Sequence, residues 1–383
     1  MDSLLRARHT AGAYAELSDP ASFSARLQRD MLSVYLDKHL IVGALPPEAS
    51  GADGASAEPN PDRAEGPRRN NYGFKKVQIL PGNVGYLELT QFADAAVAGG
   101  TAVGAMNFLA NADALIIDLR ENGGGHASMI QLLTGYFLAE PAHLVSWYKR
   151  ATNETEQSWS QAYVPGKRMP DTPLFVLTSS FTGSAAEEFA YDLKNLERAT
   201  IVGETTGGAA HTIELHFFDF GSFRTALQVP AGRSISPITK TNWEAVGVTP
   251  DIAVPASNAL LTAQAEALKL LTEKAASERD KYGLAWAQTG LDAELNPVTL
   301  TVKELKEYAG KFGPRTLSLE GSHLTYQREG RPKLRLVPMG KDLFGAEEAA
   351  YFRLRFTRDE AGRIDGVIGM YDNGRQDREA KTK

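Results

Sequence analysis

The sequence predicts an α/β protein built on a mostly parallel sheet that helices cover. Between residues 84 and 202, short apolar segments typical of strands alternate with longer segments in which apolar residues recur at helical spacing. This alternation is typical of parallel strands, because each pair needs a crossover that a helix usually supplies. We expect three regions: an N-terminal helical cap and linker (1–70), the α/β core (71–285) and a small antiparallel β domain (295–383).

The N-terminal region is expected to begin with one amphipathic helix. Apolar residues between 18 and 39 recur at three- and four-residue spacing, and Ser18 or Asp19 precedes Pro20 as a helix cap. This pattern predicts a helix that ends at His39. The segment 46–71 is rich in Pro, Gly, Ala, Ser and Glu and has no apolar period, which predicts a long exposed loop.

The core is expected to alternate strands and helices in a regular order. Hydrophobic periodicity predicts strands at 84–89, 114–119, 174–177 and 200–202, and helices near 95–110, 127–137 and 185–195. One further long helix, with apolar residues from Leu261 to Leu271 on one side, is expected to end near Tyr282 and Gly283 and to close the domain.

The C-terminal region has a different pattern. From about residue 298 apolar and polar residues alternate in short segments separated by Gly-containing turns, such as 320–321, 329–330 and 372–374. Alternation of this kind predicts a small antiparallel sheet or barrel. The charged residues 378–383 are expected to form a frayed tail.

Composition excludes several classes of function. A net charge of -6 offers no basic surface for nucleic acid, and the absence of cysteine excludes disulfides, thiol catalysis and thiolate metal sites. No apolar run is long enough to span a membrane, and the first residues lack the apolar core of a signal peptide. We therefore expect no nucleic-acid partner and no membrane span; the oligomeric state stays open.

The most informative feature is a serine on the turn between a buried strand and a helix. Ser184 follows the apolar segment 173–177 by a short turn and begins the helix predicted at 185–195. A hydroxyl there faces unpaired amide donors and the positive end of the helix dipole, which favours an oxyanion beside it. The alternative is a capping box, in which Ser184 and Glu187 only fix the start of the helix.

A serine nucleophile needs a base and oxyanion donors, and the sequence offers candidates for both. His39, His126 and His211 lie near turns, and each has the alternative of being an ordinary hydrogen-bonded histidine. The glycine run 123–125 directly follows an apolar strand and opens a helix, so its amides can approach a ligand oxygen closely. This run is not a nucleotide-binding motif, because it lacks both GxGxxG and GK[ST].

Three segments together resemble the S41 peptidase family of tail-specific and C-terminal processing proteases. They are 119–124 (LRENGG), 178–187 (TSSFTGSAAE) and 201–208 (IVGETTGG), in the order and spacing of that family. The resemblance covers about residues 71–271 and implies a crotonase/ClpP-like core. It implies a serine endopeptidase that forms an acyl-enzyme on Ser184.

The resemblance also indicates which branch of the family to expect. The serine–lysine branch carries a lysine where this chain has Ala209, so a different base is needed. The branch of tricorn protease and the interphotoreceptor retinoid-binding protein modules uses a histidine in a DxH-like segment, matched here by His39, and an acid in an NWEGVGV-like segment, matched by Glu244. The resemblance therefore implies His39 as general base and Glu244 as the orienting acid.

Further roles follow from the same resemblance. The amides of Ala185 and of Gly124 or Gly125 are the expected oxyanion donors, and His211 with Gly208 is expected to contact substrate. An exchange of roles between His39 and His211 stays open. No metal or other cofactor is expected, and the expected substrates are peptides or unfolded protein segments.

The sequence has no segment of PDZ length between the helical cap and the sheet, so a PDZ module is not expected to select the substrate. The main rival function is a non-catalytic module that binds a retinoid or fatty acid on the same fold. The family's members favour a periplasmic or extracellular location, and a cytoplasmic one stays open.

Overall fold

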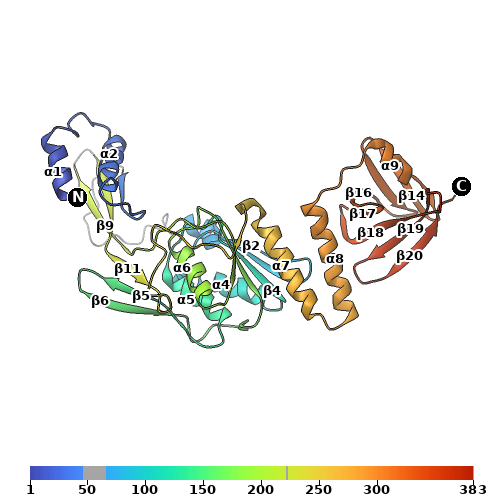
Figure 1. Cartoon of the computed structure of the whole chain (residues 1–383), viewed down its shortest axis with the longest axis horizontal. Coiled ribbons are helices and arrows are strands. Elements are labelled where there is room, and N and C mark those ends of the chain that lie inside the picture. Colours follow the sequence, from blue (N-terminus) through green and yellow to red (C-terminus); the bar gives the residue numbers. More distant parts are fainter. Residues whose placement is uncertain (46–65, 221–222, 383) are drawn as a thin grey trace. The chain divides into compact units, whose positions relative to one another are not determined.

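The computed structural model describes residues 1–45, 66–220 and 223–382, and Figure 1 shows its secondary structure. These residues divide into two compact units: 1–79 with 85–263, and 80–84 with 264–383. The predicted loop 46–71 lies mostly outside the described residues. No described helix is long and apolar enough to cross a membrane.

The centre of the first unit is a six-stranded sheet with the order β12-β8-β7-β4-β3-β2. The pairs β4–β7, β7–β8 and β8–β12 are parallel, which confirms the predicted α/β class with a mostly parallel core. The strands are β2 (Phe74–Leu80), β3 (Val84–Leu89), β4 (Ala114–Asp118), β7 (Leu174–Thr178), β8 (Thr200–Gly203) and β12 (Ile252–Ala253).

Three helices pack on this sheet through one continuous hydrophobic core. They are α4 (Ala95–Leu109), α5 (Ala127–Phe137) and α6 (Ala185–Asn195), each within a residue or two of its predicted bounds. Phe189 on α6 has no exposed surface, and its ring lies 5.4 Å from that of Phe92 and 6.3 Å from that of Phe137. This packing fixes α6, and with it the serine at its start.

Parallel pairing brings three loops to one edge of the sheet. Asp118, the last residue of β4, pairs with Leu177 near the end of β7, and Thr178 pairs with Gly203 at the end of β8. The loops that follow these strands hold the three sequence motifs of the candidate site. The carboxyl edge of a parallel sheet is where α/β proteins generally bind ligands.

Two smaller sheets extend the first unit. One has the order β1-β10-β9 and the other β11-β5-β6, and all pairs in both are antiparallel. The strands are β1 (Ile41–Leu45), β5 (His143–Lys149), β6 (Glu154–Trp159), β9 (Ile213–Asp219), β10 (Arg224–Pro230) and β11 (Gly232–Ile235). Two short 3-10 turns, η1 (Asn71–Gly73) and η2 (Ala256–Asn258), also belong to this unit.

The N-terminal helix ends earlier than predicted. Two helices form, α1 (Asp2–Thr10) and α2 (Pro20–Leu32), and Asp19 caps α2 by accepting a hydrogen bond from the Ser22 amide. The prediction that the helix reaches His39 is wrong. The segment after Leu32 is largely exposed and offers α2 no further apolar face to bury, so the chain turns toward β1 instead.

The helical region after the sheet also differs from its prediction. It is two helices, α7 (Ala259–Lys274) and α8 (Glu278–Leu295), rather than one that ends near Tyr282 and Gly283. Ser277 starts α8 by accepting a hydrogen bond from the Asp280 amide, and such a cap is a signal that apolar periodicity does not contain. Gly283 lies inside α8, and a Cβ added at this position would meet no atom within 4 Å.

The C-terminal region is an eight-stranded antiparallel meander, as predicted. Its strands follow one another in order, and a bridge between Phe312 and Lys381 links its first strand to the end of the chain. Arg378, expected in a frayed tail, pairs with Ile368 instead. The elements are α9 (Val302–Tyr308), β13 (Gly310–Phe312), β14 (Arg315–Glu320), β15 (His323–Arg328), β16 (Lys333–Gly340), β17 (Leu343–Ala346), β18 (Ala349–Arg358), β19 (Ile364–Tyr371) and β20 (Gln376–Ala380).

Candidate active site

Ser184 occupies a strained position at the start of α6. Its backbone φ of 50° and ψ of -119° lie outside the regions that residues with a side chain usually adopt. Such strain costs about 1–3 kcal/mol and persists only where surrounding contacts enforce it. The Ser184 side chain is half-buried on the turn between β7 and α6, as the sequence predicts.

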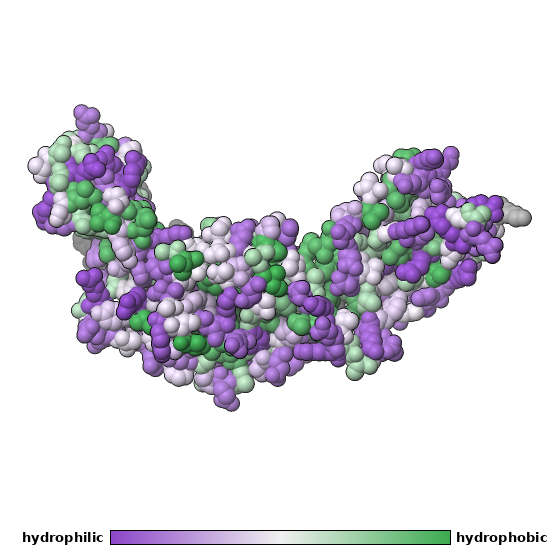
Figure 2. All heavy atoms as spheres, in the orientation of Figure 1, coloured by the Kyte–Doolittle hydropathy of each residue, from purple (hydrophilic) through white to green (hydrophobic). Residues whose placement is uncertain are grey.

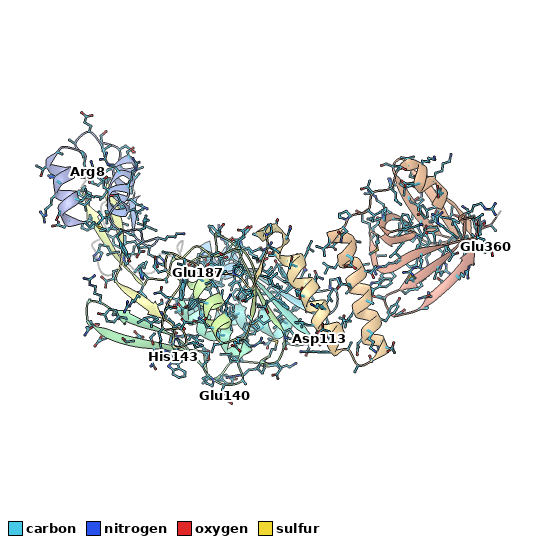
Figure 3. All side chains as sticks on the ribbon, viewed as in Figure 1. Arg8, Asp113, Glu140, His143, Glu187 and Glu360 are labelled. Atoms are coloured by element: carbon cyan, nitrogen blue, oxygen red, sulfur yellow. The ribbon has the colours of Figure 1, made fainter. Side chains whose placement is uncertain are left out.

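Glu187 is the contact that enforces this turn. Its carboxylate has no exposed surface and accepts four hydrogen bonds. Figure 3 labels the Glu187 side chain. The donors are the Ser184 amide at 2.9 Å, the Thr206 hydroxyl at 2.5 Å, the Gly208 amide at 2.5 Å and the Ala209 amide at 2.9 Å. Ser184 and Glu187 also make both contacts of a capping box, the alternative role that the sequence offers for this serine, although the contact from the helix amide to the Ser184 hydroxyl is not a full hydrogen bond. Glu187 therefore joins the serine turn to the turn that follows β8.

Asn122 joins the glycine loop to the same serine turn. Its side chain is fully buried, donates to the Leu89 carbonyl at 2.9 Å and accepts from the Gly124 amide at 2.9 Å. Its carbonyl accepts from the Gly183 amide at 3.0 Å. The loop after β4 is thus held against the residue that precedes Ser184.

The glycine loop lies directly against the serine. A Cβ on Gly124 would come within 2.8 Å of the Ser184 Cβ and 3.1 Å of the Ala185 nitrogen, so only glycine fits there. Of the predicted oxyanion donors, the Gly124 amide already bonds to Asn122. No hydrogen bond occupies the Ala185 or Gly125 amide within the described part of the chain.

Asp37 connects the two candidate histidines. The carboxylate of Asp37 is buried; one oxygen accepts from the His39 amide at 2.8 Å, and the other lies 2.6 Å from His211 Nδ1. The two histidines come from segments 172 positions apart in the numbering, yet one carboxylate contacts both. The structure therefore brings His39 and His211 together.

Glu244 lies at the same place. One of its carboxylate oxygens accepts from the Ala210 amide at 2.7 Å and lies 3.6 Å from His211 Nδ1. Trp243, beside it in the sequence, is buried and donates to the Ala209 carbonyl at 3.1 Å, which anchors the segment. Two carboxylates therefore flank the imidazole of His211.

Two buried polar atoms at this site lack hydrogen-bond partners among the described residues. They are Nδ1 of His39 and the second carboxylate oxygen, Oε1, of Glu244. An imidazole nitrogen can donate and a carboxylate oxygen can accept, so each atom lacks what the other supplies. Leaving such groups unpaired is costly, which favours a closer approach of the two side chains.

The electrostatic surroundings keep His39 neutral. Burial lowers the pKa of His39 below its ordinary value of 6.5, and the Asp37 and Glu244 carboxylates oppose this shift without reversing it. The imidazole of His211 lowers the pKa of His39 further, and the charge of Glu187 raises it slightly without reversing the shift. A neutral imidazole at this position is able to accept a proton at neutral pH.

The same carboxylates raise the question of a metal ion. Ligand atoms from Asp37, His211 and Glu244 lie within 4.8 Å of one another. The separation of 2.6 Å between His211 Nδ1 and the Asp37 oxygen is that of a charge-assisted hydrogen bond, with a proton where an ion would have to sit. In this arrangement the cluster fits a proton better than a metal ion.

A lysine does reach the turn that follows β8, although it comes from elsewhere in the sequence. Lys38 donates its ammonium to the carbonyl of Gly207, next to the turn where the serine–lysine branch carries its base. Lys38 is exposed, and a lysine that serves as a base needs burial or a neighbouring cation to lose its proton. Lys38 therefore anchors the turn.

Other residues selected from the sequence have structural contacts. His126 caps α5 by accepting from the Ser128 amide at 3.2 Å, and Arg120 bonds to Asp118 and to the Ala256 carbonyl. Sequence reasoning did not identify Asp37 or Asn122 as functional residues. The Asp-x-His spacing was a signal for Asp37, because an aspartate side chain often accepts a hydrogen bond from the backbone amide of the residue two positions later.

Residues 83–254 match the model of peptidase family S41, which confirms the resemblance inferred from three motifs. The chain is 34% identical over 128 residues to a carboxyl-terminal-processing protease of Synechocystis, covering 33% of this chain and 28% of that one. It is 30% identical over 186 residues to the chloroplastic carboxyl-terminal-processing peptidase 2 of Arabidopsis thaliana, covering 46% of this chain and 34% of that one.

Solved structures of similar proteins match more loosely. The photosystem II D1 C-terminal processing protease is 24% identical with a TM-score of 0.38, covering 45% of this chain and 42% of that one. The tricorn protease is 19% identical with a TM-score of 0.33, covering 56% of this chain and 19% of that one. The chain thus spans about a third or less of the length of the two sequence relatives described above.

Proposed function

Because residues 83–254 match the model of peptidase family S41, we propose that the chain is a serine endopeptidase whose nucleophile is Ser184. The observation that carries the proposal is the strained backbone of Ser184, held by buried Glu187 at the start of α6. A cap needs no such conformation, since an ordinary helix cap is extended. A nucleophile gains from it, because the turn presents its hydroxyl beside free helix amides.

His39 is the proposed general base and Glu244 its orienting acid. Three observations support this assignment. Burial lowers the pKa of His39, the charge of Glu244 acts on His39 by raising that pKa, and Nδ1 of His39 and Oε1 of Glu244 both lack hydrogen-bond partners among the described residues. His39 takes the proton of Ser184 as the hydroxyl attacks the peptide carbonyl, and then gives it to the leaving amine. Glu244 stabilises the imidazolium that forms between these steps.

The amides of Ala185 and Gly125 are the proposed oxyanion donors. Both are free of hydrogen bonds within the described residues, whereas the amide of Gly124 is not. Gly124 still contributes, because its missing side chain lets the loop approach Ser184. Water then hydrolyses the acyl-enzyme, with no cofactor required for these steps. Peptides or unfolded segments are the proposed substrates, and a location outside the cytoplasm stays a prediction.

A second assignment has its own specific support. His211 holds a buried carboxylate at 2.6 Å through Nδ1, which is the relation of base to acid in a catalytic triad. In that assignment Asp37 orients His211, and His39 contacts substrate. The geometry of the carboxylates favours His211, while the unpaired atoms and lowered pKa favour His39.

A fluorophosphonate probe tests the proposal directly. We expect covalent labelling of the wild-type chain, no labelling of Ser184→Ala, and a loss of kcat by about 10⁴-fold or more against an unfolded protein substrate. His39→Gln and His211→Gln separate the two bases, because the true base is needed for labelling and the other residue is not. His143→Gln serves as control, since that ring stacks on Trp159 outside the site.

The rival functions give different results in the same experiment. A ligand-binding module would bind a fatty acid or retinoid saturably and would not be labelled by the probe. A serine that only caps the helix would give a Ser184→Ala variant that is less stable by about 1 kcal/mol and otherwise unchanged. Either result would remove Ser184 from catalysis.

A further inference from the structure

The strand β9 is the open edge of a sheet. In the order β1-β10-β9, it pairs with β10 on one side, and no described strand pairs with its other side. Proteins usually protect such an edge, because its free amides and carbonyls are able to pair with another chain. The open edge of β9 is therefore able to pair with an additional strand.

The hydrogen-bond pattern shows which residues of β9 face outward. At one end the Ala231 amide bonds to the Thr212 carbonyl, and at the other the Phe220 amide bonds to the Phe223 carbonyl, at 2.9 Å and 3.0 Å. In an antiparallel ladder such pairs alternate with non-bonded ones. Even-numbered residues of β9 thus point their backbone groups toward β10, and the odd-numbered ones point theirs to the open side.

The same odd-numbered residues carry exposed apolar side chains. Ile213, Leu215 and Phe217 are 40%, 53% and 57% exposed, and Ile41, on the same face of β1, is 41% exposed. On the opposite face Val42 of β1 packs with Met31 of α2, whereas β9 itself is exposed along its whole length. Exposed apolar surface of this extent marks an interaction site more often than chance. Figure 2 shows hydrophobic residues in green on the lobe that holds α1, α2 and β9.

The position of β9 in the chain links it to the candidate active site. β9 begins two residues after His211, and β1 begins two residues after His39. Asp37 contacts both of these histidines. A ligand aligned along β9 is therefore directed toward the residues proposed to act on it.

We propose that the substrate docks as an added strand on β9, as an extended polypeptide with apolar side chains at alternate positions. This inference rests on the proposed function and specifies its substrate. An extended chain supplies the two things that the edge lacks: backbone groups in register with those of Ile213, Leu215 and Phe217, and apolar side chains for the exposed face. A small apolar ligand would contact the exposed apolar side chains but would leave the outward amides and carbonyls of β9 unpaired. A folded globular partner seldom presents a free strand.

Binding to a chain that cannot turn over tests the docking separately from catalysis. The probe is a fluorescein-labelled, unstructured peptide with leucine at alternate positions and serine between, titrated by anisotropy against Ser184→Ala protein. In this background Leu215→Pro removes one outward amide and leaves the ladder with β10 intact, because that amide does not bond to β10. We expect saturable binding by the parent, and about tenfold weaker binding by the proline variant.

Matched variants separate the backbone from the side chain. Leu215→Ala keeps the amide and loses the side chain, so it should weaken binding less than Leu215→Pro. Leu215→Asp should weaken it strongly, whereas Val97→Asp, at an exposed apolar position on α4, should not. Circular dichroism melting of each variant checks that the fold is kept.

The outcomes decide between the proposal and its rivals. Absence of binding by the parent, or equal binding by Leu215→Pro, overturns the proposal. A dimer in sedimentation that Leu215→Asp dissociates, with peptide affinity unchanged, would assign the face to a second copy of the chain instead. Fluorophosphonate labelling of the Leu215→Pro variant with an intact Ser184 reports on the proposed function alone, so the two failures are distinguishable.

Discussion

At the scale of single residues, buried carboxylates determine the geometry of the site. Glu187 holds Ser184 to the turn after β8, and Asp37 holds His39 and His211 together. Neither carboxylate needs to react to be essential, because each fixes the position of a group that does. Their replacement should therefore affect both stability and activity.

Glu187→Gln should destabilise the chain by about 2–4 kcal/mol. The amide group of glutamine offers one acceptor in place of two, and its NH₂ would face donors such as the amides of Gly208 and Ala209. Urea denaturation measures the change. Glu204→Gln is the control, because Glu204 accepts two amide hydrogen bonds at a half-buried site, whereas Glu187 is fully buried. An equal loss in both variants would contradict the role given to Glu187.

The pH dependence of activity follows from the lowered pKa of His39. A general base must be unprotonated, so kcat/KM should be constant near neutral pH and should decline only below the ordinary histidine value of about 6.5. A pH profile of kcat/KM with a small ester substrate measures this. A decline centred above pH 6.5 would argue against His39 as the base.

At the scale of elements, α6 carries a pair of buried acids as well as the serine. Glu188 and Asp192 lie one turn apart, and each has a carboxylate oxygen without a hydrogen-bond partner in the described chain. Burial raises the pKa of Glu188 from 4.5 to about 8, and burial together with Glu188 raises the pKa of Asp192. Both acids are therefore held neutral at the pH where exposed carboxylates are charged.

The raised pKa of Glu188 predicts a loss of stability with rising pH. Between its ordinary value of 4.5 and about 8, the folded chain keeps a proton that the unfolded chain releases. The free energy of unfolding should therefore fall as pH rises through this window. Glu188→Gln should reduce the slope, and Glu188→Gln with Asp192→Asn should reduce it further. Urea unfolding at several pH values measures the slope; an unchanged slope in both variants would refute the explanation.

At the scale of the whole molecule, each of the two compact units has a large hydrophobic core of its own. The second core is rich in aromatic rings, and Phe344 lies in it with no exposed surface, 4.8 Å from the ring of Tyr308 and 5.5 Å from that of Phe356. The candidate active site draws only on residues of the first unit. The predicted boundaries of three regions stay a prediction.

Phe344→Ala should destabilise the second unit by about 3–5 kcal/mol, the usual loss for a large side chain removed from a core. Calorimetry should show a lower melting temperature for the transition of that unit. Fluorophosphonate labelling of Ser184 at a temperature where both units are folded should be unchanged. A loss of labelling there would show that the second unit supports the site.

The sequence by itself determined the features that depend on neighbouring residues. The alternation of strands and helices, the C-terminal meander and the serine between β7 and α6 follow from local periodicity and turn chemistry. The end of α2 at Leu32 and the break before Ser277 depend on capping and burial, which periodicity describes poorly.

Only the tertiary structure decided what surrounds the serine. The bridge from Asp37 to His211, the four donors around Glu187 and the unpaired atoms of His39 and Glu244 join segments far apart in the chain. No local pattern encodes these contacts, because parallel pairing of β4, β7 and β8 is what brings their loops to one edge. The sequence supplies the reactive groups, and the sheet determines which of them meet.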